Sequence, residues 1–337
     1  MPAKVLLSGF ADEGAVKKTA LEQMTLLAAV GMKYYSIRFV DAGSGVKNVM
    51  LLTDDEIRTL QQLHREYDVR VATLGSPIGK IKIKDVDDGT HNRYVPFAEY
   101  LEKDVRRAIA LAHAFDTKLI RGFSFYPPKG ERPEPYLTQA GDMLGQIAAL
   151  CEREGVIFGL EVEANLVGQT GPLTMELYRH VNSKALMLIF DGANLLVQLG
   201  SRKAVLENYH AMKEGVGWMH VKDYHQKGKI QWQGHVDEGM LKNFVPADIG
   251  DCHHLEIFRD FAKRIPAIER KLKKFGVPGV FLDLEPHLKG GGQFGGFSGP
   301  DGFGVALRSL MRVLDQARIA YELRTYKDIE AIKRAQA

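Results

Sequence analysis

The chain has 337 residues, of which 45% are hydrophobic and 26% are charged, and its formal net charge is +3. This composition is typical of a globular protein with one large domain or two smaller ones. The near-neutral charge without a basic stripe argues against a nucleic-acid-binding protein, and the lack of a run of about 18 apolar residues argues against a membrane-spanning one.

Short apolar or β-branched runs alternate with helical patterns along the whole chain. The predicted strands cover Val5–Phe10, Tyr34–Val40, Val69–Leu74, Lys118–Phe123, Ile157–Val162, Leu186–Asp191, Gly217–Val221 and Gly279–Leu284. The predicted helices lie near residues 16–30, 54–66, 95–114, 136–154, 173–181, 201–213, 254–275 and 303–319. Strand–helix units that repeat without a break in composition predict one (β/α)8 TIM barrel over residues 1–337.

Three connections are longer than a barrel requires. They are residues 75–94 after the third strand, an insertion at 225–253 after the seventh, and a Gly-rich loop at 288–304 after the eighth. Long loops at the C-terminal face of a barrel usually cover or shape the site. The Gly-rich loop contains a GxGxxG pattern, but no helix opens directly after it and no βαβ unit follows. We therefore interpret it as a lid rather than a dinucleotide fingerprint, with a phosphate cradle as the alternative.

Four predicted strands end in a side chain that can bind a metal ion. These side chains are Glu161, Asp191, His220 and Glu285, in the contexts FGLEVEAN, LMLIFDGAN, GWMHVKDY and VFLDLEPH. The first three lie about 30 residues apart, the length of one strand–helix unit. A parallel barrel brings successive strand ends together at its C-terminal face, whereas a doubly wound open sheet would bind ligand at one switch point. We predict one divalent cation here, Mn²⁺ or Mg²⁺ in the first place and Zn²⁺ or Co²⁺ as alternatives. The competing interpretation is that these are ordinary exposed residues at strand ends.

Three of these ligands are followed, two residues later, by a second polar residue. Glu163, Lys222 and His287 would point the same way as the ligands that precede them, because side chains alternate across a strand. Two carboxylates beside a metal suit proton transfer next to a carbonyl, so we predict Glu161 and Glu285 as the acid–base pair. Lys222 or His287 would protonate an oxygen or a leaving group.

Contacts to the substrate are predicted from the strand ends and the long loops. The candidates are Glu163, Arg38, Phe294 and Phe297. Arg38 ends the second predicted strand, and the two phenylalanines lie in the Gly-rich loop. Their aromatic rings suit stacking on a sugar or an aromatic group, with simple loop packing as the alternative.

The cellular compartment is indicated by the cysteines and by the first residues. Cys151 and Cys252 form no disulfide framework, which fits a reducing cytosol. The start of the chain, MPAKVLLSGFADE, has one Lys and an apolar run too short for a signal peptide. We therefore expect a cytoplasmic protein.

The ends of the last four strands resemble a known superfamily. LEVEAN, FDGAN, HVKDY and LEPH resemble the xylose isomerase-like barrels, which include sugar phosphate isomerases/epimerases and ketose 3-epimerases. The resemblance covers nearly the whole chain in unit order. It implies that the four ligands bind one Mn²⁺-type ion and that the two glutamates exchange the substrate proton.

Two stretches are more similar to the catalytic α subunits of bacterial C-glycoside deglycosidases. They are KNFVPADIGDCHH (Lys242–His254) and FLDLEPHLKGGGQFGGFSGPDGFG (Phe281–Gly304). This resemblance implies C2 proton abstraction from a 3-oxo-C-glycoside, elimination of an aromatic aglycone, and a small β subunit in a hetero-oligomer. After LEV the chain has Glu163-Ala164-Asn165-Leu166 in place of the epimerases' Asn-Arg-Phe-Glu. A metal-dependent keto-sugar isomerase/epimerase is therefore the alternative.

Two further branches fit less well. The AP-endonuclease branch of the superfamily uses three metals and several histidines from early strands. The first 160 residues here contain only His64, His91 and His113, none in a clear ligand pair. A non-catalytic sugar-binding barrel would be favoured by loss of the ligand residues, and these are all present.

Overall fold

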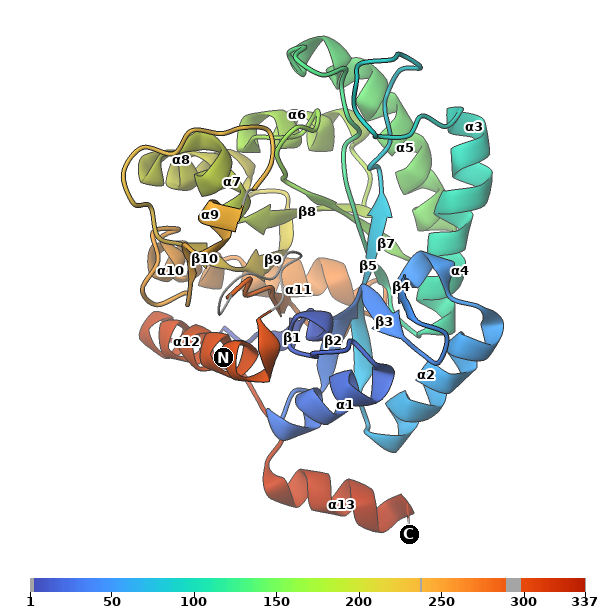
Figure 1. The fold of residues 1–337 in the computed structure, drawn as a ribbon, viewed down its shortest axis with the longest axis vertical. Helices are drawn as coiled ribbons and strands as arrows, with labels where there is room; N and C mark the ends of the chain where they lie inside the picture. The colour runs from blue at the N-terminus through green and yellow to red at the C-terminus, as the bar shows by residue number, and fades with distance from the viewer. Residues whose placement is uncertain (1–2, 237, 289–297, 337) are drawn as a thin grey trace.

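The computed structural model describes the chain apart from residues 1–2, 237, 289–297 and 337. In this part of the chain, eight parallel strands form one sheet that curls into a barrel with helices around it (Figure 1). The strands are β1 (Leu6–Gly9), β2 (Tyr34–Ile37), β5 (Arg70–Ile78), β6 (Leu119–Gly122), β7 (Ile157–Glu161), β8 (Leu186–Asp191), β9 (Val216–Val221) and β12 (Phe281–Leu284). Their order is β1-β12-β9-β8-β7-β6-β5-β2, and β1 also lies beside β2. The predicted (β/α)8 barrel is confirmed.

Helices connect the strands and cover the outside of the barrel. They are α1 (Ala20–Ala29), α2 (Asp54–Glu66), α3 (Phe97–Tyr100), α4 (Arg106–Ala114), α5 (Leu137–Arg153), α6 (Gly171–Val181), α7 (Gly192–Leu199), α8 (Arg202–Met212), α9 (Glu238–Leu241), α10 (His254–Ala262), α11 (Ile265–Lys273), α12 (Gly299–Ala317) and α13 (Tyr326–Gln336). Local sequence sets their ends. For example, Thr53 and Glu56 form a capping box at the start of α2. No described helix is both long and apolar enough to cross a bilayer.

Several elements differ from the sequence-based expectation. The helix expected at 95–114 is α3, a π-helical turn at Leu101–Val105 and then α4. The helix expected at 254–275 is divided into α10 and α11, and a proline lies in the first turn of α11, where its missing N–H costs nothing. The helices α7 and α13 were not predicted. The N-cap of α7, Asp191, begins the sequence DGAN, which is also typical of a turn.

Two small antiparallel pairs of strands lie outside the barrel sheet. The second predicted strand breaks after Ile37, and β3 (Phe39–Asp41) then pairs antiparallel with β4 (Val46–Asn48). Directly before the insertion, β10 (Asp223–Tyr224) pairs antiparallel with β11 (Phe244–Val245), which lies inside it. Most of the predicted Gly-rich loop lies outside the described residues, and its last part, from Gly299, is already the start of α12.

Trp218 on β9 fills the barrel interior below the strand ends. The side chain is fully buried, and a Cβ on Gly159 of the neighbouring barrel wall would lie 2.2 Å from its ring. A large side chain opposite a glycine gives the dense packing expected of a barrel core. The interior of the barrel is therefore filled by side chains at this level.

Gly79 joins the end of β5 to the mouth of the barrel. Its φ is +92°, and a Cβ there would lie 2.0 Å from the carbonyl oxygen of Phe123. We expect Gly79→Ala to lower the free energy of unfolding by about 1–3 kcal/mol from backbone strain alone, and further through the clash. Thermal unfolding measures the effect. Gly130→Ala is the matched control, because its φ is +83° and its Cβ would meet nothing within 4 Å. Equal losses in the two variants would show that the Phe123 contact relaxes without cost.

Candidate metal centre

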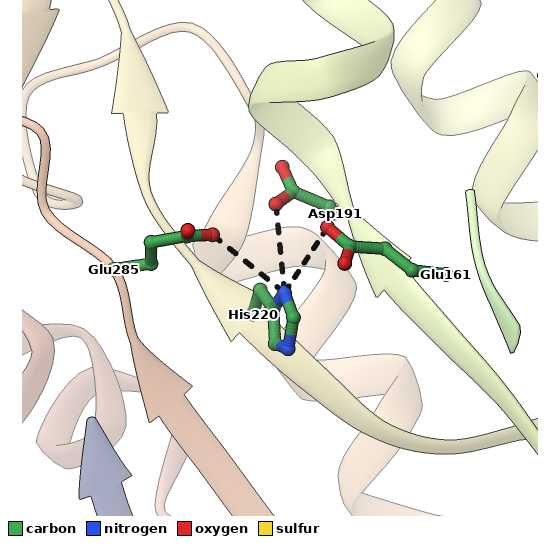
Figure 2. Close-up of side chains that lie close together, drawn as sticks. All are labelled: Glu161, Asp191, His220 and Glu285. Carbon is green, nitrogen blue, oxygen red and sulfur yellow. Dashed lines mark hydrogen bonds and ion pairs between the residues drawn. The ribbon is translucent and has the colours of Figure 1, made fainter. Parts of the chain in front are cut away.

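Four side chains converge at the C-terminal end of the barrel (Figure 2). Nδ1 of His220 lies 3.2 Å from Oε1 of Glu161, 3.9 Å from Oδ2 of Asp191 and 3.7 Å from Oε2 of Glu285. One ligand atom from each residue lies within 4.8 Å of the others, and all four residues are buried. The structure thus brings the four sequence-predicted ligands to one point.

Strand register and a helix cap place these ligands. Asp191 is the partner of His220 across β8 and β9, and His220 is in turn the partner of Asp283 on β12. Glu285 therefore stands two residues higher on the adjacent strand. Asp191 also caps α7, because its Oδ1 accepts a hydrogen bond from the Asn194 N–H at 3.0 Å. This bond fixes the carboxylate and leaves Oδ2 directed toward the cluster.

The donor set fits a divalent cation. Three buried carboxylates repel one another, and burial of ionised groups is costly unless they are paired or bind a metal. Oε2 of Glu161 is buried without a hydrogen-bond partner, although the Arg121 guanidinium lies 3.6 Å away. Carboxylate oxygens with one imidazole nitrogen are ligands that Mn²⁺, Mg²⁺ and Zn²⁺ all accept. The residues that would hold the ion are Glu161, Asp191, His220 and Glu285.

A second group with metal-binding spacing shares Glu285 but already contains a cation of its own. Glu13, Glu285 and His287 also have ligand atoms within 4.8 Å of one another. However, Arg38 lies between the two glutamates, with Nη1 2.6 Å from Glu285 and Nη2 3.1 Å from Glu13. The first group also contains a cation, Lys222, but it offers four ligands, all of them buried, against three, so it is the better metal site.

Lys222 lies against the same carboxylates that would bind the metal. Its Nζ is 2.9 Å from Oδ2 of Asp191 and 3.0 Å from Oε2 of Glu285. Burial lowers the pKa of Lys222, but these two carboxylates raise it more, so the net shift is upward. Burial likewise raises the pKa of Glu285, while Lys222 and Arg38 lower it well below its ordinary value. Both groups are therefore charged at neutral pH.

Replacing Lys222 should separate metal binding from turnover. We expect Lys222→Met to bind Mn²⁺ about tenfold more tightly or better, since a cation beside two ligand oxygens is removed. Turnover should fall about 100-fold or more through loss of a proton donor. Chelator competition measures the first effect and a turnover assay the second. The control is Lys80→Met, because Lys80 faces the same cavity but pairs with Glu163. Weaker metal binding in Lys222→Met than in Lys80→Met would contradict the idea that Lys222 competes with the metal ion for these carboxylates.

Arg38 and His287 line the cavity, and each lies close to acidic side chains. The Arg38 guanidinium contacts Asp12, Glu13 and Glu285 and stacks on the Phe10 ring at 4.4 Å. It therefore orients Glu285. Nδ1 of His287 lies 2.8 Å from Glu13, and its ring meets Phe244 edge-on at 5.1 Å. Both side chains remain predicted participants, next to the cluster rather than within it.

Glu163 lies on the cavity wall and pairs with Lys80. Because β7 ends at Glu161, the alternation expected for residues two apart does not continue to Glu163. Its carboxylate is 30% exposed and pairs with Lys80 at 2.8 Å. The other predicted substrate contacts, Phe294 and Phe297, lie outside the described residues.

Three residues at the site were not singled out from the sequence. Arg121 at the end of β6 approaches Glu161, Asn194 Nδ2 donates to Glu161 Oε1 at 3.1 Å, and Lys80 follows β5. Arg121 had a detectable signal, since it is a charged residue in an otherwise apolar strand. Asn194 lies three residues after Asp191, the spacing between an N-cap residue and the N–H that it accepts from. This can be recognised only once α7 is known to begin at Gly192.

A cavity of about 430 Å³ opens over the cluster, within the range that holds a small ligand. Its lining residues are Arg38, Phe39, Asn48, Pro77, Lys80, Arg121, Phe123, Glu161, Glu163, Asn194, Lys222, Val236, Leu241, Phe244, Glu285 and His287. The charged residues near the metal ligands come from the barrel strands. The apolar ones include Phe39 from the β3–β4 hairpin and Val236, Leu241 and Phe244 from the insertion. The cavity thus has a polar floor and an apolar wall.

The fold and the cluster define a (β/α)8 barrel with a candidate site for a divalent cation at its C-terminal face. The chain belongs to the xylose isomerase-like TIM barrel family, whose model matches residues 24–312. No curated protein matches the chain in sequence.

Solved structures share this fold at low sequence identity. A xylose isomerase-like TIM barrel protein from Mycobacterium smegmatis, in complex with magnesium, is 15% identical, with 94% of this chain and 97% of that chain covered and a TM-score of 0.59. The IOLI protein with a bound zinc atom is 13% identical, with 93% and 99% covered and a TM-score of 0.61. A D-allulose 3-epimerase from Methylomonas is 15% identical, with 93% and 99% covered and a TM-score of 0.58. At these low identities, the similarities show a shared fold.

Proposed function

We propose that this protein is the catalytic subunit of a metal-dependent C-glycoside deglycosidase. It cleaves the carbon–carbon bond between a 3-oxo sugar and an aromatic aglycone. The observation that carries the proposal is the two-sided cavity, in which acid–base groups on the floor face an aromatic wall. A free ketose leaves that wall without a partner, whereas an aryl glycoside fills both sides.

The floor of the cavity binds the oxo-sugar. Arg121 and Lys222 present donors to sugar oxygens, and Asn194 holds the Glu161 carboxylate in place. A divalent cation, with Mn²⁺ as our first choice, would supply a Lewis acid that stabilises negative charge on the C3 oxygen. Because the C3 carbonyl acidifies the neighbouring C2 proton, a carboxylate suffices as the base.

Glu161 is the better placed base of the two glutamates. Its Oε2 accepts no hydrogen bond, and the residue lines the cavity. Burial raises the pKa of both carboxyl groups, and neighbouring cations lower it by more. However, Glu285 forms close ion pairs with Arg38 and Lys222, whereas the nearest described Arg or Lys to Glu161 is Arg121 at 3.6 Å. Glu161 therefore takes the C2 proton, and Glu285 keeps Lys222 in position.

Elimination follows from the resulting charge on the sugar. The electrons of the broken C2–H bond form the C1–C2 double bond, and the C1–aryl bond breaks with its electron pair leaving on the aryl carbon. That carbon takes a proton from Lys222 or, alternatively, from His287. The products are a free aglycone and a sugar with a double bond beside the C3 carbonyl.

The aromatic wall would hold the aglycone. Phe39 is 38% exposed at the mouth, and Phe123 and Phe244 line the cavity. Aromatic rings that pack offset or edge-to-face add about 0.5–1.5 kcal/mol per pair beyond the area that they bury. Phe294 and Phe297 stay predicted contacts.

A second candidate is a metal-dependent keto-sugar isomerase/epimerase. It is favoured by the shared first step, since an enolate formed by Glu161 can regain a proton from the opposite side of the cluster, where the Lys222 ammonium lies against Glu285. The D-allulose 3-epimerase with the same fold agrees with this chemistry. The two functions differ in whether the enolate expels a group or regains its proton.

The proposal also includes a cytoplasmic location and a small second subunit. Both cysteines are free and buried, in keeping with a reducing compartment. Val46 on β4 and Leu51 shortly after it are exposed apolar side chains that a partner would bury.

Chromatography with mass detection tests the proposal. Mn²⁺-loaded protein, with its second subunit where a neighbouring gene supplies one, receives a 3-oxo-C-glucoside and a ketohexose together. We expect free aglycone and an unchanged ketose. An epimerised ketose with intact glycoside would assign the protein to the isomerase branch instead.

A further inference from the structure

Asp283 is a fully buried carboxylate one layer below the metal ligands. It lies on β12 two residues before Glu285 and has no exposed surface. Its Oδ1 accepts hydrogen bonds from the hydroxyls of Ser8 and Ser36, and its Oδ2 accepts one from Ser36 at 2.7 Å. In the described part of the chain, no Lys or Arg forms an ion pair with it. Two hydroxyls do not offset the cost of burying a full charge, so a further partner is expected.

His220 has a polar atom without a partner on that side. Nδ1 of the imidazole faces the three carboxylates, while Nε2 is buried without a hydrogen-bond partner. Oδ2 of Asp283 lies 4.0 Å from Nε2, and the two residues are register partners across β9 and β12. The Phe10 ring packs edge-on against the imidazole at 5.2 Å and limits its rotation. A buried carboxylate held only by two serine hydroxyls and a buried ring nitrogen without a partner therefore face each other.

We propose that Asp283 is a positioning residue for the metal ligand His220. An imidazole that binds a cation through Nδ1 carries its proton on Nε2, and such ligands usually donate that proton to a carboxylate or carbonyl. Asp283 accepts it, fixes the tautomer that keeps the Nδ1 lone pair available, and raises the basicity of Nδ1. Ser8 and Ser36 hold the carboxylate from β1 and β2. The 4.0 Å between Nε2 of His220 and Oδ2 of Asp283 is longer than a hydrogen bond. We expect the two atoms to approach each other once binding of the cation at Nδ1 confines the proton to Nε2.

Metal affinity tests this role independently of catalysis. Asp283→Asn keeps the shape but removes the charge, and we expect Mn²⁺ to bind about 10–100-fold more weakly in chelator competition. Asp223→Asn is the matched control. Asp223 is an equally buried aspartate, 3.5 Å from the imidazole of His254, and it belongs to no metal-binding group. An unchanged affinity in Asp283→Asn, or an equal loss in Asp223→Asn, would overturn the proposal.

Two further measurements separate positioning from a merely structural role. In the Zn²⁺-loaded protein, nitrogen NMR should show the His220 proton on Nε2, and Asp283→Asn should shift that resonance while circular dichroism stays unchanged. If Asp283→Asn does not fold, Ser36→Ala decides, because it removes one hydrogen bond from the carboxylate. Weaker Mn²⁺ binding in that variant supports the role, and wild-type affinity refutes it. The inference rests on the metal centre alone, so absence of lyase activity would leave this result unaffected.

Discussion

Glu161→Gln and Glu285→Gln are each expected to abolish turnover without unfolding the barrel. Glutamine keeps the size of the side chain, but its amide neither takes a proton nor supplies an anionic ligand. General acid–base groups contribute about 10²–10⁴-fold to rate, and we expect losses at or beyond the upper end because the metal site is damaged too. The measurement is steady-state aglycone release at saturating Mn²⁺, with thermal unfolding in parallel.

Glu163→Gln is the control for both variants. Glu163 lies two residues after Glu161 and faces the same cavity, yet it pairs with Lys80 and has no contact with the cluster. We expect a small change, mainly in KM. Near wild-type activity in Glu161→Gln would exclude this carboxylate as the base, and near wild-type activity in Glu285→Gln would exclude the role of Glu285 in holding Lys222 and the metal ion.

His220→Ala is expected to remove the metal. The imidazole supplies the single nitrogen ligand of the cluster, and its Nδ1 approaches all three carboxylates. Without it, three carboxylates and Lys222 remain, so we expect the affinity for Mn²⁺ to fall by at least the roughly 10–100-fold seen when an outer-shell partner is lost. Metal analysis after dialysis measures the stoichiometry.

His287→Ala decides between the two groups with metal-binding spacing. His287 belongs to the second group, with Glu13 and Glu285, and not to the first. We expect this variant to keep a full equivalent of metal. Full occupancy in His220→Ala combined with loss in His287→Ala would place the ion between Glu13 and Glu285 instead.

The barrel was predictable because its strands are buried on both faces. Each reads as a short apolar run, and parallel strands need a crossover between them, so runs and helical patterns alternate. The same logic located Glu161, Asp191, His220 and Glu285, since a ligand that ends an apolar run must point to the C-terminal face. The insertion and the β3–β4 hairpin carry no such periodicity, so the apolar wall that they build was not foreseen.

The surroundings of the ligands were harder to predict because they depend on contacts between distant strands. The spacing of Lys222 and His287 correctly indicated polar side chains near the cluster, but their partners, Asp191 and Glu13, come from other strands. Asp283 lies within the apolar run of its strand, and in the sequence it looks like an ordinary polar residue that alternates with apolar ones. Its role emerges only when β9 and β12 are placed side by side.

The location of Mn²⁺ by anomalous scattering from a crystal of the metal-loaded protein is the most direct test of the candidate metal centre. We predict one peak, within coordination distance of Nδ1 of His220 and of carboxylate oxygens from Glu161, Asp191 and Glu285. A barrel mouth without a peak, or a peak beside Glu13 and His287, would contradict the metal centre on which the proposed chemistry depends.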